Sequence, residues 1–199
     1  MTPSRPDHST LTDDELIRLI RGGETDAFEE LVRRTSRPAY RLARRITRNH
    51  EDADDVVQES FVKAYQALDR FQLGRAIAPW VLTIVARTAL SSVRQSKRRA
   101  ASALDDPGPD GSAPLSERVA DPASDPAALT KRLEVERAFE TLSEEHRVIL
   151  ALRVEGDLPY ASIAEALGIP AGTVMSRLAR AREALIEAMS QRKAVADES

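Results

Sequence analysis

Two arginines near the C-terminus have the spacing that contact with nucleic acid requires. Arg177 and Arg180 lie in the segment 166–182, which contains no acidic residue. At about 100° per residue in a helix, they share one face with Thr173 and Ser176. Guanidinium groups bind phosphates and guanine edges, and hydroxyls suit phosphate or base contacts. This face predicts nucleic-acid recognition, although a lone helix of this composition is more often an ordinary amphipathic surface helix.

The residues that precede this helix favour the first interpretation. Counted from Tyr160, the sequence YASIAEALGIPAGTVMSRLA has Ala164 at its fifth place, Gly168 at its ninth and Val174 at its fifteenth. A small residue at the fifth place lets the second helix approach closely, and glycine at the ninth permits a left-handed turn. This pattern predicts a helix-turn-helix, whose second helix enters the major groove of duplex DNA.

A second basic face is predicted on a helix over residues 80–99. One stripe of this helix is polar and basic, and it comprises Thr83, Arg87, Ser91, Arg94 and Arg98, with Trp80 near its start. The opposite face, which we expect to be buried, comprises Leu82, Val85, Ala86, Ala89 and Val93. Cations for the phosphates and an aromatic ring for an unstacked base are what single-strand binding requires. Trp80 could equally be a core residue that caps the domain.

An acidic face is predicted on a helix over residues 50–70. Its core side comprises Val57, Phe61, Ala64 and Leu68, and its polar arc comprises Asp52, Asp55, Gln58 and Glu59. Val62 falls in the middle of the polar arc and so points outward. Two interpretations stay open, a solvated surface and a docking surface for a basic partner, and Val62 slightly favours the second.

The chain lacks the residue combinations of an enzyme. It has no cysteine, which removes disulfides, thiolate zinc sites and cysteine nucleophiles and suits a reducing compartment. There is no glycine-rich phosphate loop, metal-ligand cluster or nucleophile–base pair, and the three histidines are scattered. We therefore expect no catalytic residue, no metal and no cofactor. No apolar run approaches the ~18 residues of a membrane span, so we expect a soluble, cytoplasmic protein.

The predicted fold class is all-α, with two small helical domains on one flexible linker, and there is no sustained period-2 alternation. The first domain covers residues 12–99, between a disordered tail at 1–11 and an acidic linker at 100–132 that is rich in proline. The second domain covers residues 133–191 and is followed by a tail at 192–199. We expect Pro38 to bend or interrupt the helix that begins near Asp26, and Pro79 to lie in the first turn of the helix over 80–99.

Two long segments carry a family resemblance. DAFEELVRR and RPAYRLARRITRNHEDADDVVQESFVKAYQALDRF resemble region 2 of the sigma-70 family of RNA polymerase sigma factors, and YASIAEALGIPAGTVMSRLARAREAL resembles region 4. Because only these two regions and a short linker are present, the chain resembles the extracytoplasmic-function (group 4) subfamily. The resemblance covers nearly the whole chain apart from the linker and the tails.

The resemblance implies a role for each surface. Asp55, Gln58 and Glu59 match residues that dock on the clamp helices of the polymerase β′ subunit, and the polymerase-binding set is Asp52, Asp55, Gln58, Glu59 and Val62. Two elements match those that hold the −10 strand of the promoter: the loop over residues 71–80, which contains Arg75, and the helix after it. The −10 set of DNA-binding residues is Arg75, Trp80, Thr83, Arg87, Ser91, Arg94 and Arg98. The −35 set is Thr173, Ser176, Arg177 and Arg180. The implied partners are core RNA polymerase, through β′ and the β flap, and promoter DNA; an anti-sigma factor is suggested by the resemblance alone.

Several positions depart from the family pattern. Met175 stands where lysine or arginine is common, and Ile77, Ala78, Ala86, Arg87 and Ser91 also differ from the usual residues. These departures leave the pattern of apolar core positions intact, so they affect the promoter sequence that is recognised rather than the fold.

Two other functions are alternatives to promoter recognition. A stand-alone helix-turn-helix regulator should bind duplex DNA without polymerase and should dimerise. An adaptor protein is the second alternative, but it leaves Arg177 and Arg180 without a function.

Overall fold

The computed structural model describes residues 8–102 and 126–197, and within these ranges every regular element is a helix. The predicted linker at 100–132 therefore lies largely outside the described residues. The elements are α1 (Asp13–Arg21), α2 (Thr25–Thr47), α3 (His50–Ala67), η1 (Leu68–Arg70), α4 (Ile77–Ser102), α5 (Pro126–Glu140), α6 (Glu144–Val154), α7 (Tyr160–Leu167) and α8 (Ala171–Asp197). The all-α prediction is confirmed.

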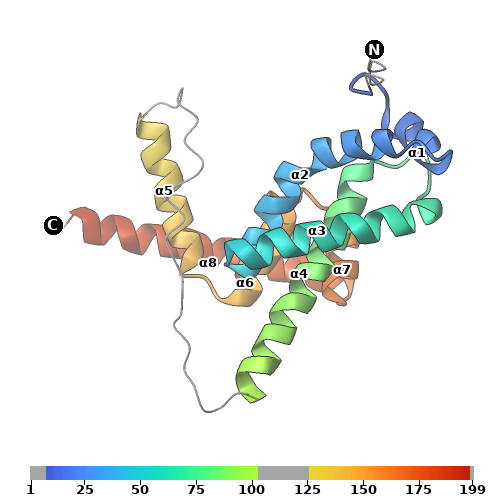
Figure 1. The fold of residues 1–199 in the computed structure, drawn as a ribbon. Helices are drawn as coiled ribbons and strands as arrows, with labels where there is room; N and C mark the ends of the chain where they lie inside the picture. The colour runs from blue at the N-terminus through green and yellow to red at the C-terminus, as the bar shows by residue number, and fades with distance from the viewer. Residues whose placement is uncertain (1–7, 103–125, 198–199) are drawn as a thin grey trace.

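The helices form two groups that lie against each other. In the first, α2 packs against α1, α3 and α4, and α3 packs against α4; in the second, α8 packs against α5, α6 and α7. The two groups meet where α4 packs against α7 and α2 packs against α6. Figure 1 shows α4 passing through the middle of the molecule, with its C-terminal half projecting away from the other helices. The buried apolar residues consequently form one continuous cluster.

Helix α2 differs from its prediction at Pro38. The helix continues through this residue to Thr47, although proline has no N–H to donate to the carbonyl four residues earlier. Buried side chains on both sides of the proline, among them Thr35 and Ala39, hold the helix together by packing. An interruption is therefore wrong, because tertiary contacts outweigh the loss of one backbone hydrogen bond.

The loop that leads into α4 is held by α1. Arg21 Nη2 donates to three backbone carbonyls at the start of this connection, those of Leu68 (2.8 Å) and Asp69 (3.1 Å) in η1 and that of Phe71 (2.5 Å) after it. The Asp13 and Asp14 carboxylates at the start of α1 accept from the backbone N–H groups of Ile77 (3.2 Å) and Gly74 (2.9 Å), respectively. Acidic side chains at a helix N-terminus satisfy its free N–H groups. As a result α4 begins at residue 77, earlier than the predicted residue 80.

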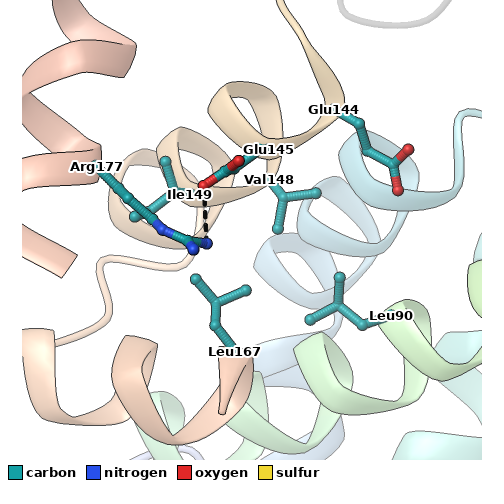
Figure 2. A pocket seen from close by; sticks show the side chains of 7 residues that line it. All are labelled: Leu90, Glu144, Glu145, Val148, Ile149, Leu167 and Arg177. Carbon is teal, nitrogen blue, oxygen red and sulfur yellow. Dashed lines mark ion pairs between the residues drawn. The ribbon is translucent and has the colours of Figure 1, made fainter. Parts of the chain in front are cut away.

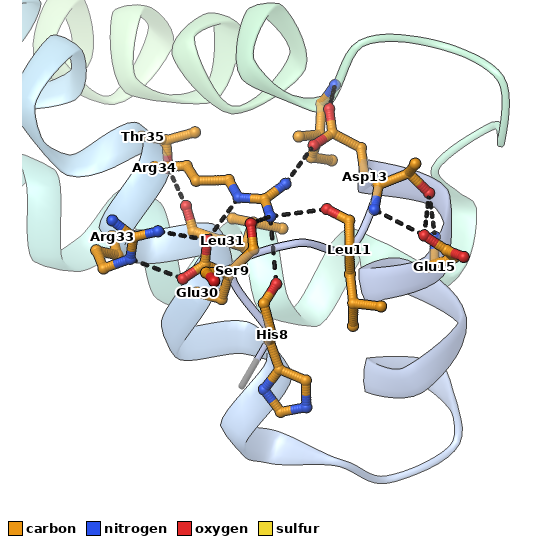
Figure 3. Close-up of polar contacts among 12 residues, drawn as sticks. His8, Ser9, Leu11, Asp13, Glu15, Glu30, Leu31, Arg33, Arg34 and Thr35 are labelled. Carbon is orange, nitrogen blue, oxygen red and sulfur yellow. Dashed lines mark hydrogen bonds and ion pairs between the residues drawn. The ribbon is translucent and has the colours of Figure 1, made fainter. Parts of the chain in front are cut away.

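Residues 8–11, which we expected to belong to a disordered tail, lie against α2 instead. Figure 3 shows Arg34 at the centre of this contact, with its Nη2 donating to the backbone carbonyls of His8 (3.3 Å), Ser9 (3.1 Å) and Leu11 (2.7 Å). Arg34 also pairs with Asp13 at 3.3 Å and with Glu30 at 2.6 Å. One guanidinium therefore fastens the N-terminal segment and the start of α1 to α2.

We predict that Arg34→Ala lowers the free energy of unfolding by about 2–3 kcal/mol, because a partly buried charged donor is lost and Glu30 is left with one partner fewer. Chemical denaturation followed by circular dichroism measures this change. Arg37→Ala, which removes an exposed arginine of the same helix, serves as the control and should change stability by less than about 0.5 kcal/mol. Equal losses in the two variants would contradict the role assigned to Arg34.

The Glu30 carboxylate gives the fold a pH dependence. Hydrogen bonds from Arg33 and then Arg34 lower the pKa of Glu30 from 4.5 to about 2. Because the folded pKa lies below the unfolded one, ionised Glu30 stabilises the fold above about pH 4.5, and this contribution is lost as the pH falls toward 2. We therefore predict that Glu30→Gln lowers the Tm at pH 7 and that the difference from the unchanged protein shrinks below pH 4.5. A Tm difference that stays constant with pH would contradict this.

Candidate polymerase and nucleic-acid interfaces

The helix-turn-helix is present where the sequence predicts it. Helix α7 ends at Gly168, whose φ of 66° lies in the left-handed region that glycine adopts without strain, and whose N–H donates to the Ala164 carbonyl. Ile163, Val174 and Leu178 are buried between α7 and α8. This packing turns the opposite side of α8 outward. Ser176 and Arg180 are exposed, and Thr173 is half-buried.

Arg177 lies on the same helix, but its side chain forms an ion pair. Its Nη1 is 2.8 Å from Glu145 Oε1 of α6, and its side chain is 35% exposed. Figure 2 shows this ion pair among the side chains that line a cavity, which has a volume of about 390 Å³ and lies between the two helix groups. Met175, which departs from the family pattern, is 60% exposed on the outer side of α8. The outer side of α8 thus combines hydroxyl, cationic and apolar groups.

The basic stripe of α4 is largely exposed. Arg87, Ser91, Arg94 and Arg98 lie at the surface, and Arg75 is exposed in the loop before the helix. Trp80 is half-buried and contacts the Phe71 ring edge-on, with centroids 5.2 Å apart. Part of the Trp80 side chain thus packs against the core and part of it remains exposed.

Thr83 does not lie on that exposed stripe. It is 7% exposed, and its hydroxyl donates to the Pro79 carbonyl at 2.7 Å. The prediction that Thr83 faces outward is wrong because α4 packs against α2, α3 and α7, so its buried face is wider than that of an amphipathic surface helix.

The acidic face of α3 is exposed as predicted for most of its members. Asp55, Gln58, Glu59 and Val62 are exposed, Val62 to 53%, and Asp52 is half-buried. The core side is rotated slightly from the prediction, with Val56 buried and Val57 only half-buried. Glu59 pairs with Lys63 one turn later at 2.7 Å.

Sequence reasoning missed Tyr65 on this face. Its ring is 44% exposed and meets Phe28 of α2 edge-on, with centroids 5.0 Å apart. The signal was available, because Tyr65 follows Val62 by three residues and so lies beside it on the helix. Together the two residues make an apolar patch within the acidic face.

Among the histidines, aspartates and glutamates that the structure describes, no group of three or more is placed to hold a metal ion. None of the helices described combines the length and the apolar character needed to cross a membrane.

Comparison with known proteins identifies the family to which the chain belongs. Residues 31–99 match the family model Sigma-70 region 2, and residues 132–185 match Sigma-70, region 4. The ECF RNA polymerase sigma-E factor of Escherichia coli (strain K12) is 35% identical over 179 residues, which are 88% of this chain and 93% of that protein. This chain belongs to the ECF sigma-70 family. The ECF sigma factor SigM of Mycobacterium tuberculosis (strain H37Rv) is similarly related, with 34% identity over 87% of this chain and 83% of that protein.

Two solved structures share the fold of this chain. The sigma factor RpoE from Bartonella quintana, in complex with the anti-sigma factor NepR, matches 82% of this chain and 96% of its own, with a TM-score of 0.65 and 23% identity. CnrH, in complex with the cytosolic domain of CnrY, matches 90% of this chain and 97% of its own, with a TM-score of 0.59 and 25% identity. The family models and the sequence relatives identify the chain as a sigma factor, a transcription initiation factor, and favour this function over a stand-alone regulator.

Proposed function

We propose that this sigma factor binds core RNA polymerase through the acidic face of α3 and promoter DNA through α4 and α8. The observation that supports this division is the placement of three chemically different exposed surfaces on three separate helices. Asp52, Asp55, Gln58, Glu59 and Val62 suit a basic partner with apolar contacts, which we take to be the β′ clamp helices. Tyr65 extends this surface. The β flap is the second polymerase contact that we propose.

The proposed −35 contact uses the outer side of α8. Arg177 and Arg180 supply guanidinium groups that fit guanine edges or phosphates, and Thr173 and Ser176 supply hydroxyls. Because a helix-turn-helix places its second helix in the major groove, these side chains would meet duplex DNA.

The proposed −10 contact uses Arg75, Trp80 and the exposed stripe of α4, which comprises Arg87, Ser91, Arg94 and Arg98. Unpairing and unstacking cost a few kcal/mol per base. Stacking on an aromatic ring and cationic contacts with the phosphates would offset that cost as the duplex melts. We retain Thr83 only as a buried support for this stripe. Melting in this way needs no nucleotide hydrolysis and no cofactor, so we propose a non-catalytic role.

The regulation and location that we propose follow from the relatives. The sigma factor RpoE from Bartonella quintana, which shares this fold, is solved in complex with the anti-sigma factor NepR. An anti-sigma factor is therefore a partner that we propose for this chain. Since its relatives are named RNA polymerase sigma factors, we propose that it acts in the cytoplasm, beside the chromosome.

In-vitro transcription tests the proposal. The purified chain is added to core polymerase on a library of genomic fragments, and the starts of the transcripts are mapped. We expect new starts that share a −35 and a −10 sequence, and no specific DNA retention by the chain without core polymerase. Specific duplex binding by a dimer without polymerase would instead support the stand-alone regulator.

A further inference from the structure

Helix α1 contacts both ends of the connection between η1 and α4, residues 71–76. At the first end, Arg21 Nη2 donates to three backbone carbonyls, those of Leu68, Asp69 and Phe71. Because these acceptors lie within one turn of the chain, the guanidinium fixes the direction in which the backbone leaves η1. Figure 1 shows the connection passing beside α1 between α3 and α4.

At the second end, two carboxylates of the first turn of α1 bind backbone N–H groups. Asp14 accepts from the Gly74 N–H with both oxygens, at 2.9 Å to Oδ1 and 3.1 Å to Oδ2. Asp13 Oδ2 accepts from the Ile77 N–H at 3.2 Å, and Ile77 is the first residue of α4. Asp13 therefore satisfies one of the free N–H groups at the start of α4. Its other oxygen lies 3.3 Å from Arg34 Nη1, which connects this carboxylate to α2.

The connection contains one residue with a left-handed backbone. Gly74 has a φ of 82°, and a Cβ at this place would meet no other part of the protein within 4 Å. Glycine is therefore needed here for its backbone conformation and not for space. Phe71 and Ile77 are buried on either side, whereas Gly74 and Arg75 are exposed. The exposed part of the connection thus takes its conformation from the glycine and from the bonds to α1.

The two groups that the proposed −10 contact uses in this region both depend on these bonds. Arg75 comes directly after the residue that Asp14 binds, so this bond determines where the arginine side chain begins. Trp80 lies in the first turn of α4, whose first residue is held by Asp13, and its ring meets the Phe71 ring edge-on with centroids 5.2 Å apart. The positions of the cation and of the aromatic ring are thus both set from α1.

We infer that α1 is a template for the −10 contact. Asp13, Asp14 and Arg21 are positioning residues, which hold Arg75 and Trp80 where these receive unstacked bases. The inference rests on the proposed function of α4 and of the connection before it, and it adds residues that act without touching DNA. A loop that is ordered before binding loses less conformational entropy when its ligand binds. Loss of these bonds should therefore weaken capture of the −10 strand and leave polymerase binding unchanged.

Binding of single-stranded DNA by the holoenzyme tests the template. Core polymerase is assembled with the full-length chain, and fluorescence anisotropy gives the Kd for a short single strand that carries the −10 sequence mapped by in-vitro transcription. Arg21→Ala is compared with Arg18→Ala, which removes an exposed arginine of the same helix whose side chain pairs with Asp14 rather than with the connection. Asp14→Ala is compared with Asp54→Ala, which removes an exposed aspartate of α3.

We expect the Kd for the single strand to rise by about 5- to 30-fold in Arg21→Ala and in Asp14→Ala, which corresponds to the cost of ordering one backbone residue. The two controls should stay within about twofold of the unmodified chain. All four variants should bind core polymerase with the Kd of the unmodified chain, which also shows that they are folded. Single-strand Kd values that match those of the controls would overturn the template.

A double substitution separates positioning from a loss of stability. Gly74→Ala strains the same backbone without touching α1, so it should raise the Kd for the single strand by a similar factor. Because both substitutions act through one loop conformation, Asp14→Ala/Gly74→Ala should bind within about twofold of the weaker-binding single variant. Independent effects would multiply instead, and a multiplied effect would overturn the inference.

Trp80→Ala distinguishes this inference from the proposed function. It removes the aromatic ring of the −10 contact itself and should raise the Kd for the single strand by about 5- to 150-fold. If Trp80→Ala weakens binding and the α1 variants do not, the template alone is wrong. If Trp80→Ala leaves the Kd unchanged, the proposed −10 contact is wrong and the inference falls with it.

Discussion

Replacing Arg177 with alanine should lower transcription from promoters that depend on their −35 element by about 5- to 150-fold. The reason is that a side chain with bidentate contacts to a guanine or a phosphate contributes roughly 1–3 kcal/mol of discrimination. The fold should tolerate the change, because the pair of Arg177 with Glu145 is 35% and 55% exposed and such pairs contribute at most about 1 kcal/mol. Single-round in-vitro transcription with core polymerase measures the effect.

The matched control for this prediction is Arg182→Ala. Arg182 is also exposed on α8 but lies about 140° around the helix from Arg177. The Arg182→Ala variant should support transcription at the level of the unmodified chain. Both variants should bind core polymerase with the affinity of the unmodified chain. If Arg177→Ala loses polymerase binding and transcription to the same degree, the separation of the two roles is wrong.

The double substitution Asp55→Ala/Glu59→Ala should have the opposite effect and weaken the affinity for core polymerase first. Loss of charged groups that are desolvated in an interface costs about 2–4 kcal/mol, which corresponds to roughly a 30- to 1000-fold rise in Kd. Both side chains are exposed, so the isolated chain should keep its Tm. Fluorescence anisotropy of the labelled chain with core polymerase measures the Kd.

Asp54→Ala/Asp69→Ala removes the same charge from exposed positions of α3 and η1 that lie outside the proposed docking set. It should bind core polymerase with a Kd within about threefold of the unmodified chain, since rim charges act mainly on association rates. A loss as large as that of Asp55→Ala/Glu59→Ala would mean that the overall negative charge, rather than this face, attracts polymerase.

Local signals in the sequence predicted the parts of the fold that local interactions determine. Helix α7 ends at Gly168, the residue that the helix-turn-helix pattern predicts in the left-handed turn, and Pro159 precedes its first residue. The capping box of α1 was likewise recognisable from Thr12 and Glu15, which bond reciprocally. The exposed faces of α3 and α8 followed from helical periodicity, apart from Tyr65.

Distant contacts account for what the sequence did not predict. The early start of α4 depends on Asp13, which is 64 residues away along the chain. The burial of Thr83 depends on three helices that surround α4. The pairing of Arg87 with Glu165 joins residues 78 positions apart, so no short pattern contains both partners. Local periodicity carries no information about such pairs.

Pro38 has a mechanical consequence for α2. Because it cannot donate a backbone hydrogen bond, the helix is less stiff at this residue than elsewhere. The arginines that reach the second helix group from this side, Arg41 and Arg45 of α2 and Arg48, which caps it, come after Pro38. Helix α2 can therefore bend at Pro38. The half that carries these arginines can change its angle while the half that packs on α1 stays in place.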